Sequence, residues 1–212
     1  MRSIYKIVVC SLLTLSITSC EKDLLEKEQY QKEIYLIGAY NRVWTTEVSY
    51  SNEEVKTYFT VSSSCTLALD RDVNVKMKIN EELVDIYNKK YWTVLNEDKY
   101  YKSLDTDLYS IPSLENTVIK HAEGISAEVP VLIKTASLKI DQSYVIPVEI
   151  ESTTGYPISE SGYKMLILLK LKNDYSGSYQ MSGHTTLEGE TPKTIQKPKT
   201  IKPTGVNTVR LF

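Results

Sequence analysis

The chain of 212 residues contains few of the residues that carry most enzyme and metal chemistry. It has two histidines, and it lacks a GxSxG elbow and a glycine-rich phosphate loop. No charge of one sign dominates, because 25 lysines and arginines face 27 aspartates and glutamates, so the field that nucleic-acid binding requires is missing. The hydrophobic share of 42% and the charged share of 25% are typical of folded proteins. We expect a folded, non-catalytic protein without a cofactor or a nucleic-acid partner.

Metal ligands are equally scarce. His121 and His184 lie in separate segments without a cysteine at zinc-ligand spacing. The nearest match to a calcium-binding loop lacks the glycine of its sharp turn, and it consists of Asp70, Asp72, Asn74 and Glu81. The same stretch alternates as a strand, so we expect no metal site.

The N-terminus has the layout of a bacterial export signal. Basic residues precede an apolar run over residues 7–17, which is shorter than the roughly 20 residues that cross a bilayer. The sequence ITSC that follows resembles a lipobox, whose cysteine becomes the acylated first residue of the mature chain. We predict a signal peptide over residues 1–19 and lipid attachment to Cys20. The alternative is an ordinary signal peptide that ends near a chance cysteine.

The next segment resembles a tether. Residues 20–32 are polar apart from Leu24 and Leu25, and the tether to Glu33 reaches roughly 40 Å when extended. Its opening sequence EKD resembles the export signal of surface lipoproteins in Bacteroidetes. We therefore expect an outer-membrane lipoprotein, exposed on the surface and bound to the membrane through its lipid anchor.

Cysteine usage excludes a disulfide scaffold. Of the three cysteines, Cys10 leaves with the signal peptide and Cys20 carries the lipid. Cys65 then remains alone, without a histidine or a cation in its local sequence, and is interpreted as structural.

The mature sequence is dominated by alternation of apolar and polar residues, the pattern of half-buried strands. The clearest case is VNVKMKI at residues 73–79, and residues 55–61, 129–133 and 144–150 alternate in the same way. The run at residues 163–171 is apolar on both faces, which is typical of a central strand that is covered twice.

Between residues 80 and 104 the period becomes that of a helix. The predicted helix begins after Asn80, which can cap it, and its apolar stripe holds Leu83, Ile86, Tyr87 and Tyr91. A second short helix is predicted from Asn96. Strands at roughly ten-residue spacing around such an insertion favour an all-β, immunoglobulin-like antiparallel β-sandwich with a short helical insertion over about residues 80–104.

The domain predicted over residues 33–175 ends where the composition changes. Residues 176–212 bring a fresh strand pattern, followed by a stretch with three prolines and four lysines that has no core of its own. Either this tail docks as a strand on the first domain or it is the start of a second, incomplete β domain. We favour the second interpretation.

Four motifs resemble a known family: EIYLIGAY at residues 33–40, YSIPS at 109–113, YVIPVEI at 144–150 and LKNDYSGSY at 171–179. They are similar to the N-terminal immunoglobulin-like domain of unknown function in Bacteroidetes surface lipoproteins of polysaccharide-utilization loci. In that family the domain also precedes glycoside hydrolases of the endo-β-N-acetylglucosaminidase type. The motifs carry no catalytic residue, so the resemblance implies a structural or binding role.

Aromatic usage points to a carbohydrate surface. The chain has 16 tyrosines and only two phenylalanines, and tyrosine and tryptophan combine an apolar face with a polar edge that suits sugar rings. The candidate glycan-binding residues are Trp44, Tyr91, Trp92, Tyr100 and Tyr101. The alternative is that these rings only cover the edge of the sandwich.

The sequence thus leaves two functional hypotheses. The first is a surface module that assists glycan binding or presentation in a polysaccharide-utilization system, with glycan or outer-membrane glycan-uptake proteins as partners. The alternative is a structural or adhesion module that makes protein–protein contacts at the outer membrane.

Overall fold

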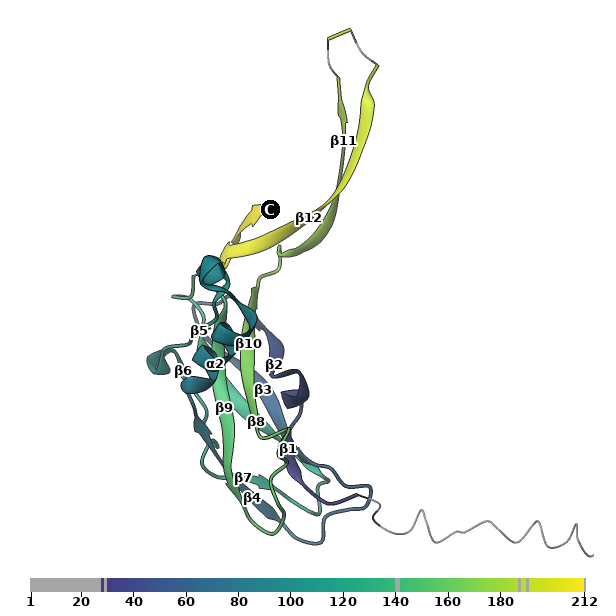
Figure 1. Ribbon diagram of the computed structural model, residues 1–212. Coiled ribbons are helices and arrows are strands. Elements are labelled where there is room, and N and C mark those ends of the chain that lie inside the picture. The colour runs from purple at the N-terminus through teal and green to yellow at the C-terminus, as the bar shows by residue number, and fades with distance from the viewer. Residues whose placement is uncertain (1–27, 29, 140–141, 187, 190, 212) are drawn as a thin grey trace, which may run out of the picture.

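The computed structural model describes residues 28, 30–139, 142–186, 188–189 and 191–211. The predicted signal peptide and Cys20 therefore lie outside the described residues. Strands are the main secondary structure of the described chain, and helices are few (Figure 1).

Two sheets form the body of the molecule. The first has the strand order β1-β3-β8-β6, and the second has the order β2-β10-β9-β4-β7, with β5 added beside β9. The strands of the first sheet are β1 (Ile34–Leu36), β3 (Glu54–Ser63), β6 (Tyr109–Ser110) and β8 (Ser126–Lys134). Those of the second are β2 (Val43–Ser49), β4 (Val73–Ile79), β5 (Lys102–Ser103), β7 (Thr117–Ile119), β9 (Tyr144–Thr153) and β10 (Lys164–Lys172). This confirms the predicted β-sandwich.

Most strand pairs are antiparallel, with two exceptions. Strand β2 runs parallel to β10, and β5 runs parallel to β9. Strand β2 forms an edge of the second sheet through a ladder of seven residue pairs with β10, and the short β5 is added beside β9, so the antiparallel centre of β9, β10 and β4 stays intact. The alternation of apolar residues predicted the strands, but it contains no information on their direction.

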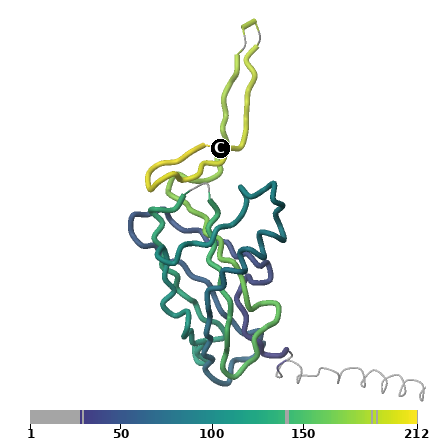
Figure 2. The backbone as a smooth tube through the Cα atoms, turned by 60° about the vertical axis from the view of Figure 1, so that its left-hand side comes forward, coloured from purple at the N-terminus to yellow at the C-terminus, as the bar shows by residue number. Residues whose placement is uncertain are grey.

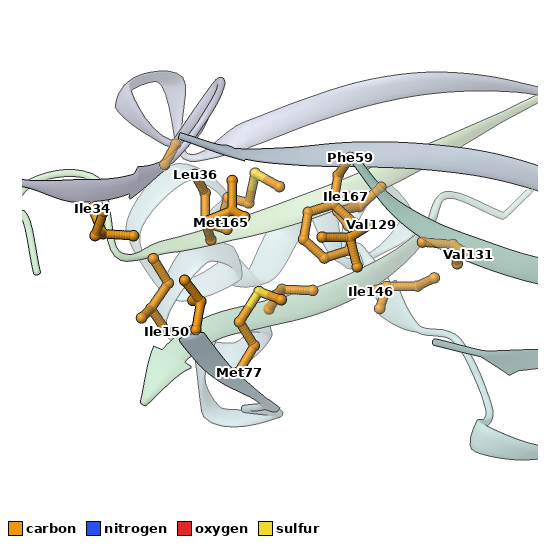
Figure 3. Packing of buried hydrophobic residues seen from close by; sticks show 14 of the residues in the cluster. Ile34, Leu36, Phe59, Met77, Val129, Val131, Ile146, Ile150, Met165 and Ile167 are labelled. Atoms are coloured by element: carbon orange, nitrogen blue, oxygen red, sulfur yellow. The ribbon is translucent and has the colours of Figure 1, made fainter. Parts of the chain in front are cut away.

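The core lies between the two sheets. Figure 3 shows Met165 and Ile167 of β10 facing Phe59 of β3 and Val129 of β8. Each of these four side chains is at most 2% exposed. Alternation along each strand therefore builds one dry layer, as the sequence predicted.

Strand β10 is also covered on its second face. Leu166 packs with Val145 of β9 against Leu83 and Val84 of helix α2 (Glu82–Tyr91). The predicted burial of β10 on both sides is therefore confirmed, and it fixes where α2 lies.

The helical insertion differs in detail from its prediction. Helix α2 is present, and the side chain of Asn80 accepts a hydrogen bond from the backbone N–H of Glu82 at 3.2 Å. The buried face, however, holds Leu83, Val84 and Asn88, while Ile86 is 54% exposed. Leu83 and Tyr87 pack on the sheet as predicted, whereas Ile86 and Tyr91 are exposed. The period defines a helix face only to within about one residue.

The second predicted helix is shorter and tighter than expected. Residues Val94–Lys99 form the 3₁₀ helix η3, which has non-helical dihedral angles at Asn96. After Tyr100 the chain is extended and enters β5. Two further 3₁₀ turns are η2 (Ala39–Asn41) and η4 (Thr106–Leu108).

Beyond β10 the chain forms a separate sheet with the order β11-β12-β13. Its strands are β11 (Gly177–Thr185), β12 (Lys193–Gly205) and β13 (Thr208–Leu211). Figure 2 shows β11 and β12 projecting from one end of the sandwich, and every residue of β11 is exposed. That this sheet begins a second domain at residue 176 stays a prediction.

The first described residues are fixed to the opposite end of the sandwich. The Glu28 carboxylate accepts hydrogen bonds from the Thr66 hydroxyl at 2.6 Å and from the backbone N–H groups of Thr66 and Leu67 at 2.9 and 3.1 Å. Lys32 donates to the carbonyl of Ala68 at 2.9 Å, and the Ser64 hydroxyl donates to the carbonyl of Gln31 at 3.0 Å. We call this set of contacts the N-terminal clamp.

Truncation of the core should destabilise the whole sandwich. We expect Ile167→Ala to lower the free energy of unfolding by about 3 kcal/mol and Ile167→Val by about 1 kcal/mol, because each removed methyl group leaves a void. Urea denaturation followed by circular dichroism measures both values. Equal stability of the two variants and the native chain would contradict the assigned packing.

The N-terminal clamp should open in acid. Hydrogen bonds from the Thr66 hydroxyl, above all, and from the backbone N–H groups of Thr66 and Leu67 lower the pKa of Glu28 from 4.5 to about 2. Because the pKa is lower in the folded state, the clamp stabilises fully above the unfolded value of 4.5 and is lost as the pH falls towards 2. The NMR signal of the Thr66 amide should shift in this range and should not do so in Glu28→Gln. A pH-independent Thr66 signal would contradict the contact.

Candidate functional site: an aromatic groove beside α2

A groove of about 250 Å³ lies between helix α2, turn η2 and the start of β10. It combines aromatic rings with charged and hydroxyl groups. Its lining includes Tyr40, Arg42, Ile86, Tyr87, Glu160, Ser161, Tyr163 and Lys164. Helix α2 supplies one wall because Leu83 and Val84 hold it on β9 and β10.

The opposite wall is a tight turn with two left-handed residues. Gly38 has φ 88°, and Arg42 has φ 62°. A side chain on Gly38 would overlap the ring of Trp44, so only glycine fits there. At the other end the Arg42 carbonyl accepts a hydrogen bond from Leu166 of β10 at 2.7 Å. The turn is therefore held at both ends and presents Tyr40, which is 81% exposed.

The charged groups of the groove have unused hydrogen-bonding capacity. Within the described chain, the Arg42 guanidinium and the Glu160 carboxylate have no hydrogen-bond or ion-pair partner. Lys164 places its ammonium 4.8 Å from the centre of the Tyr163 ring. Arg42 therefore combines a left-handed backbone conformation with an unpaired guanidinium. Residues with such a strained backbone cluster at binding sites.

Behind the groove, three tyrosines stack. The ring centres of Tyr87 and Tyr91 are 4.5 Å apart, and those of Tyr87 and Tyr101 are 5.2 Å apart at an angle of 11°. Asn88 is 4% exposed, and its amide bonds both the N–H and the carbonyl of Tyr101 at 2.9 Å. Burial raises the pKa of Tyr87 further above physiological pH, and its neutral hydroxyl is able to donate a hydrogen bond.

The residues predicted from the sequence occupy different positions. Tyr91 and Tyr101 both contact the ring of Tyr87. Trp44 packs on Gly38 and supports the turn. Trp92 is half-buried, with Lys99 5.6 Å from its ring centre.

Tyr100 follows η3, and its backbone N–H donates to Glu97 at 3.1 Å. The five predicted residues therefore do not form one platform. Their binding role stays a prediction.

Sequence reasoning missed the residues that line the groove. The helical period places Tyr87 in a buried stripe, and Tyr40, Arg42, Glu160 and Lys164 come from segments that only the fold brings together. The available signal was Gly38 beside Tyr40, because a glycine within an apolar run indicates a close approach of the backbone to another group.

A second groove, of about 360 Å³, lies between β10 and the projecting sheet. Its lining has no aromatic residue and includes Glu47, which is bonded to Lys170 at 3.0 Å and to Lys172 at 3.2 Å. Without a ring for stacking it suits a sugar less well than the groove beside α2.

No group of three potential metal ligands occurs in the part of the chain that the structure covers. In that same part, none of the helices has the length and apolarity that crossing a membrane requires.

Substitution at Gly38 tests how the turn is held. We expect Gly38→Ala to lower the free energy of unfolding by about 2 kcal/mol, because alanine disfavours a positive φ and its methyl group meets the Trp44 ring. In a Trp44→Ala background the additional cost of Gly38→Ala should be smaller by about 1 kcal/mol. Chemical denaturation of the four proteins measures this coupling. Strict additivity would show that the ring does not constrain the turn.

Comparison with known proteins places this geometry in a family. A family model described as an N-terminal domain matches residues 30–157, and one described as a C-terminal domain matches residues 163–212. The second match begins just before β10, which completes the sandwich. No curated protein matches the sequence.

Solved structures share the fold at low sequence identity. A protein of unknown function from Bacteroides ovatus is 18% identical with a TM-score of 0.65, over 86% of this chain and 62% of that chain. An auxiliary nutrient binding protein from Bacteroides thetaiotaomicron is 16% identical with a TM-score of 0.60, over 82% and 61%. A candidate carbohydrate binding protein from Bacteroides ovatus is 17% identical with a TM-score of 0.51, over 74% and 43%.

This chain therefore spans less than two thirds of the length of each of these three proteins. The N-terminal family model covers more than half of the chain, and the matched residues contain three of the four motifs noted in the sequence. This match establishes the family to which the chain belongs. The chain belongs to the Bacteroidetes family of N-terminal immunoglobulin-like domains of unknown function.

Proposed function

We propose that this protein is a non-catalytic module, anchored to the outer membrane through lipid on Cys20, that binds a glycan in the groove beside α2. The observation that carries the proposal is that the exposed ring of Tyr40 shares one groove with an unpaired guanidinium, an unpaired carboxylate and the half-buried Tyr87. Two structural neighbours are described as nutrient binding or as candidates for carbohydrate binding, which supports the same class of ligand.

The chemistry of the groove fits a sugar chain. The exposed ring of Tyr40 offers apolar area to the C–H side of a sugar ring, and Tyr87, whose ring lies against Tyr91 and Tyr101, forms part of the wall beside it. Arg42 and Glu160 offer planar groups that can bond pairs of neighbouring hydroxyls, the first as donor and the second as acceptor. A few placed polar groups around an apolar floor are typical of small-ligand sites.

The groove provides binding groups rather than an arrangement for bond cleavage. Glu160 is the one carboxylate in its lining, and cleavage of a glycoside normally uses two carboxyl groups on either side of the bond. We therefore propose capture or presentation of the glycan, with any chemical step performed by another protein.

One observation favours a second candidate function. Val94 and Leu95 of η3 are 76% and 93% exposed, and adjacent large apolar side chains at a loop tip are suited to protein–protein contact. A structural or adhesion role at the outer membrane would use this tip. Leu95→Asp should then abolish crosslinking to the partner and leave glycan binding unchanged.

Loss of Tyr40 should weaken glycan binding. We expect Tyr40→Ala to raise the dissociation constant by roughly fivefold, the equivalent of about 1 kcal/mol of lost ring stacking. Calorimetry of the full mature chain against host and plant polysaccharides measures the change.

The matched control is Tyr58→Ala, which removes another exposed tyrosine, located on β3 and outside the groove lining. Two results speak against the groove. The first is that no polysaccharide binds, and the second is that both variants weaken binding equally.

A further inference from the structure

The N-terminal clamp shortens the tether that the sequence predicts. Because Glu28 is held on the loop at residues 64–68, eight residue steps separate it from Cys20, and they span at most about 26 Å. Without the clamp, the free segment would extend to Glu33, thirteen steps away, or about 43 Å.

The clamp lies at one end of the sandwich, which we call the N-terminal pole and define as residues 28 and 30–33 with the loops at residues 64–72, 120–125 and 154–159. Hydrogen bonds join these segments. The Asp72 side chain accepts from the His121 backbone N–H at 3.0 Å, and the Tyr156 hydroxyl accepts from the Asp70 backbone N–H at 3.3 Å. Figure 1 shows this pole at the end of the molecule opposite to β11, β12 and β13.

Three large side chains remain exposed at the N-terminal pole. Tyr30 is 66% exposed, Leu67 is 37% exposed and Ile125 is 38% exposed. Each lies on a different segment of the pole, and Leu67 belongs to the loop that Glu28 holds. Aliphatic side chains accompanied by tyrosine are the residues that enter the headgroup region of a membrane.

Each lysine and arginine of the same pole lies beside a carboxylate, and carboxylates are in excess. Arg71 contacts Asp70 at 3.1 Å, Lys120 contacts Glu123 at 2.7 Å, and Lys32 lies 4.0 Å from Glu28. His121 is bonded to Asp72 at 2.6 Å. The pole therefore presents no excess of positive charge to anionic lipid, and contact with a membrane would depend on apolar burial.

We propose that the N-terminal pole docks on the lipid surface, with Tyr30, Leu67 and Ile125 in the headgroup region and the α2 groove and projecting sheet facing away. This inference rests on the proposed acylation of Cys20. The short clamped tether keeps the pole within reach of the bilayer, and the three side chains then fix its orientation. The partner is a lipid surface, recognised by apolar contact rather than by charge.

Energy transfer to the bilayer tests the orientation. The acylated full chain, in a Cys65→Ser background, is reconstituted into vesicles of phosphatidylethanolamine and phosphatidylglycerol that contain rhodamine lipid. A donor dye is attached through Ala122→Cys at the pole or through Ser182→Cys on β11; both native side chains are exposed. We expect strong transfer from position 122 and little from position 182, and the same result in high salt.

Matched variants test the clamp and the contact. Glu28→Ala should cause a loss of transfer from position 122, while Glu33→Ala should not, because the Glu33 carboxylate has no polar partner in the described chain. Tyr30→Ser combined with Leu67→Ser should cause a similar loss without changing the fold.

The possible failures are distinguishable. A chain that does not float with the vesicles overturns the proposed anchor on Cys20. A chain that floats but gives equal transfer from both dyes overturns the proposed orientation and leaves the anchor intact. Transfer that disappears in high salt overturns the apolar mode of docking, since a charged contact is the kind that salt screens.

Discussion

Burial of strand β10 on both faces is the constraint on which the rest of the structure depends. Its inward side chains, among them Met165 and Ile167, close the core against the opposite sheet, and Leu166 on the other face holds helix α2. The backbone of Leu166 also bonds the carbonyl of Arg42. One strand therefore supports the sandwich, the helix and the turn, and the groove exists because β10 holds both of its walls.

Much of the fold was predictable from the sequence because strand and helix periods are local properties. The alternation over residues 73–79 and 129–133 gave the buried faces of β4 and β8, and the apolar run at 163–171 gave the central strand. Pro147 fits within β9 because the ladder of β4 ends at Val148 and that of β5 covers only Tyr144 and Val145. Strand direction and the face of α2 depend on long-range contacts and were not predictable.

The groove could not be predicted for the same reason. Tyr40 and Tyr87 are 47 positions apart, and Glu160 follows much later in the chain. Aromatic content correctly suggested surface tyrosines, but it could not separate Trp44, whose ring packs on Gly38, from Tyr40, which is 81% exposed and lines the groove. The two residues can be told apart only when the left-handed turn between them is known, and the only sign of this turn in the sequence is the single glycine at position 38.

NMR titration of the isotope-labelled mature chain with a mixture of glycan fragments tests the central claim most directly, because the shifted signals locate the binding surface whichever sugar in the mixture binds. The account predicts concentration-dependent shifts confined to the groove, at Tyr40, Arg42, Tyr87 and Glu160. Shifts centred instead on the groove between β10 and β12, or no shifts with any fragment, would contradict it.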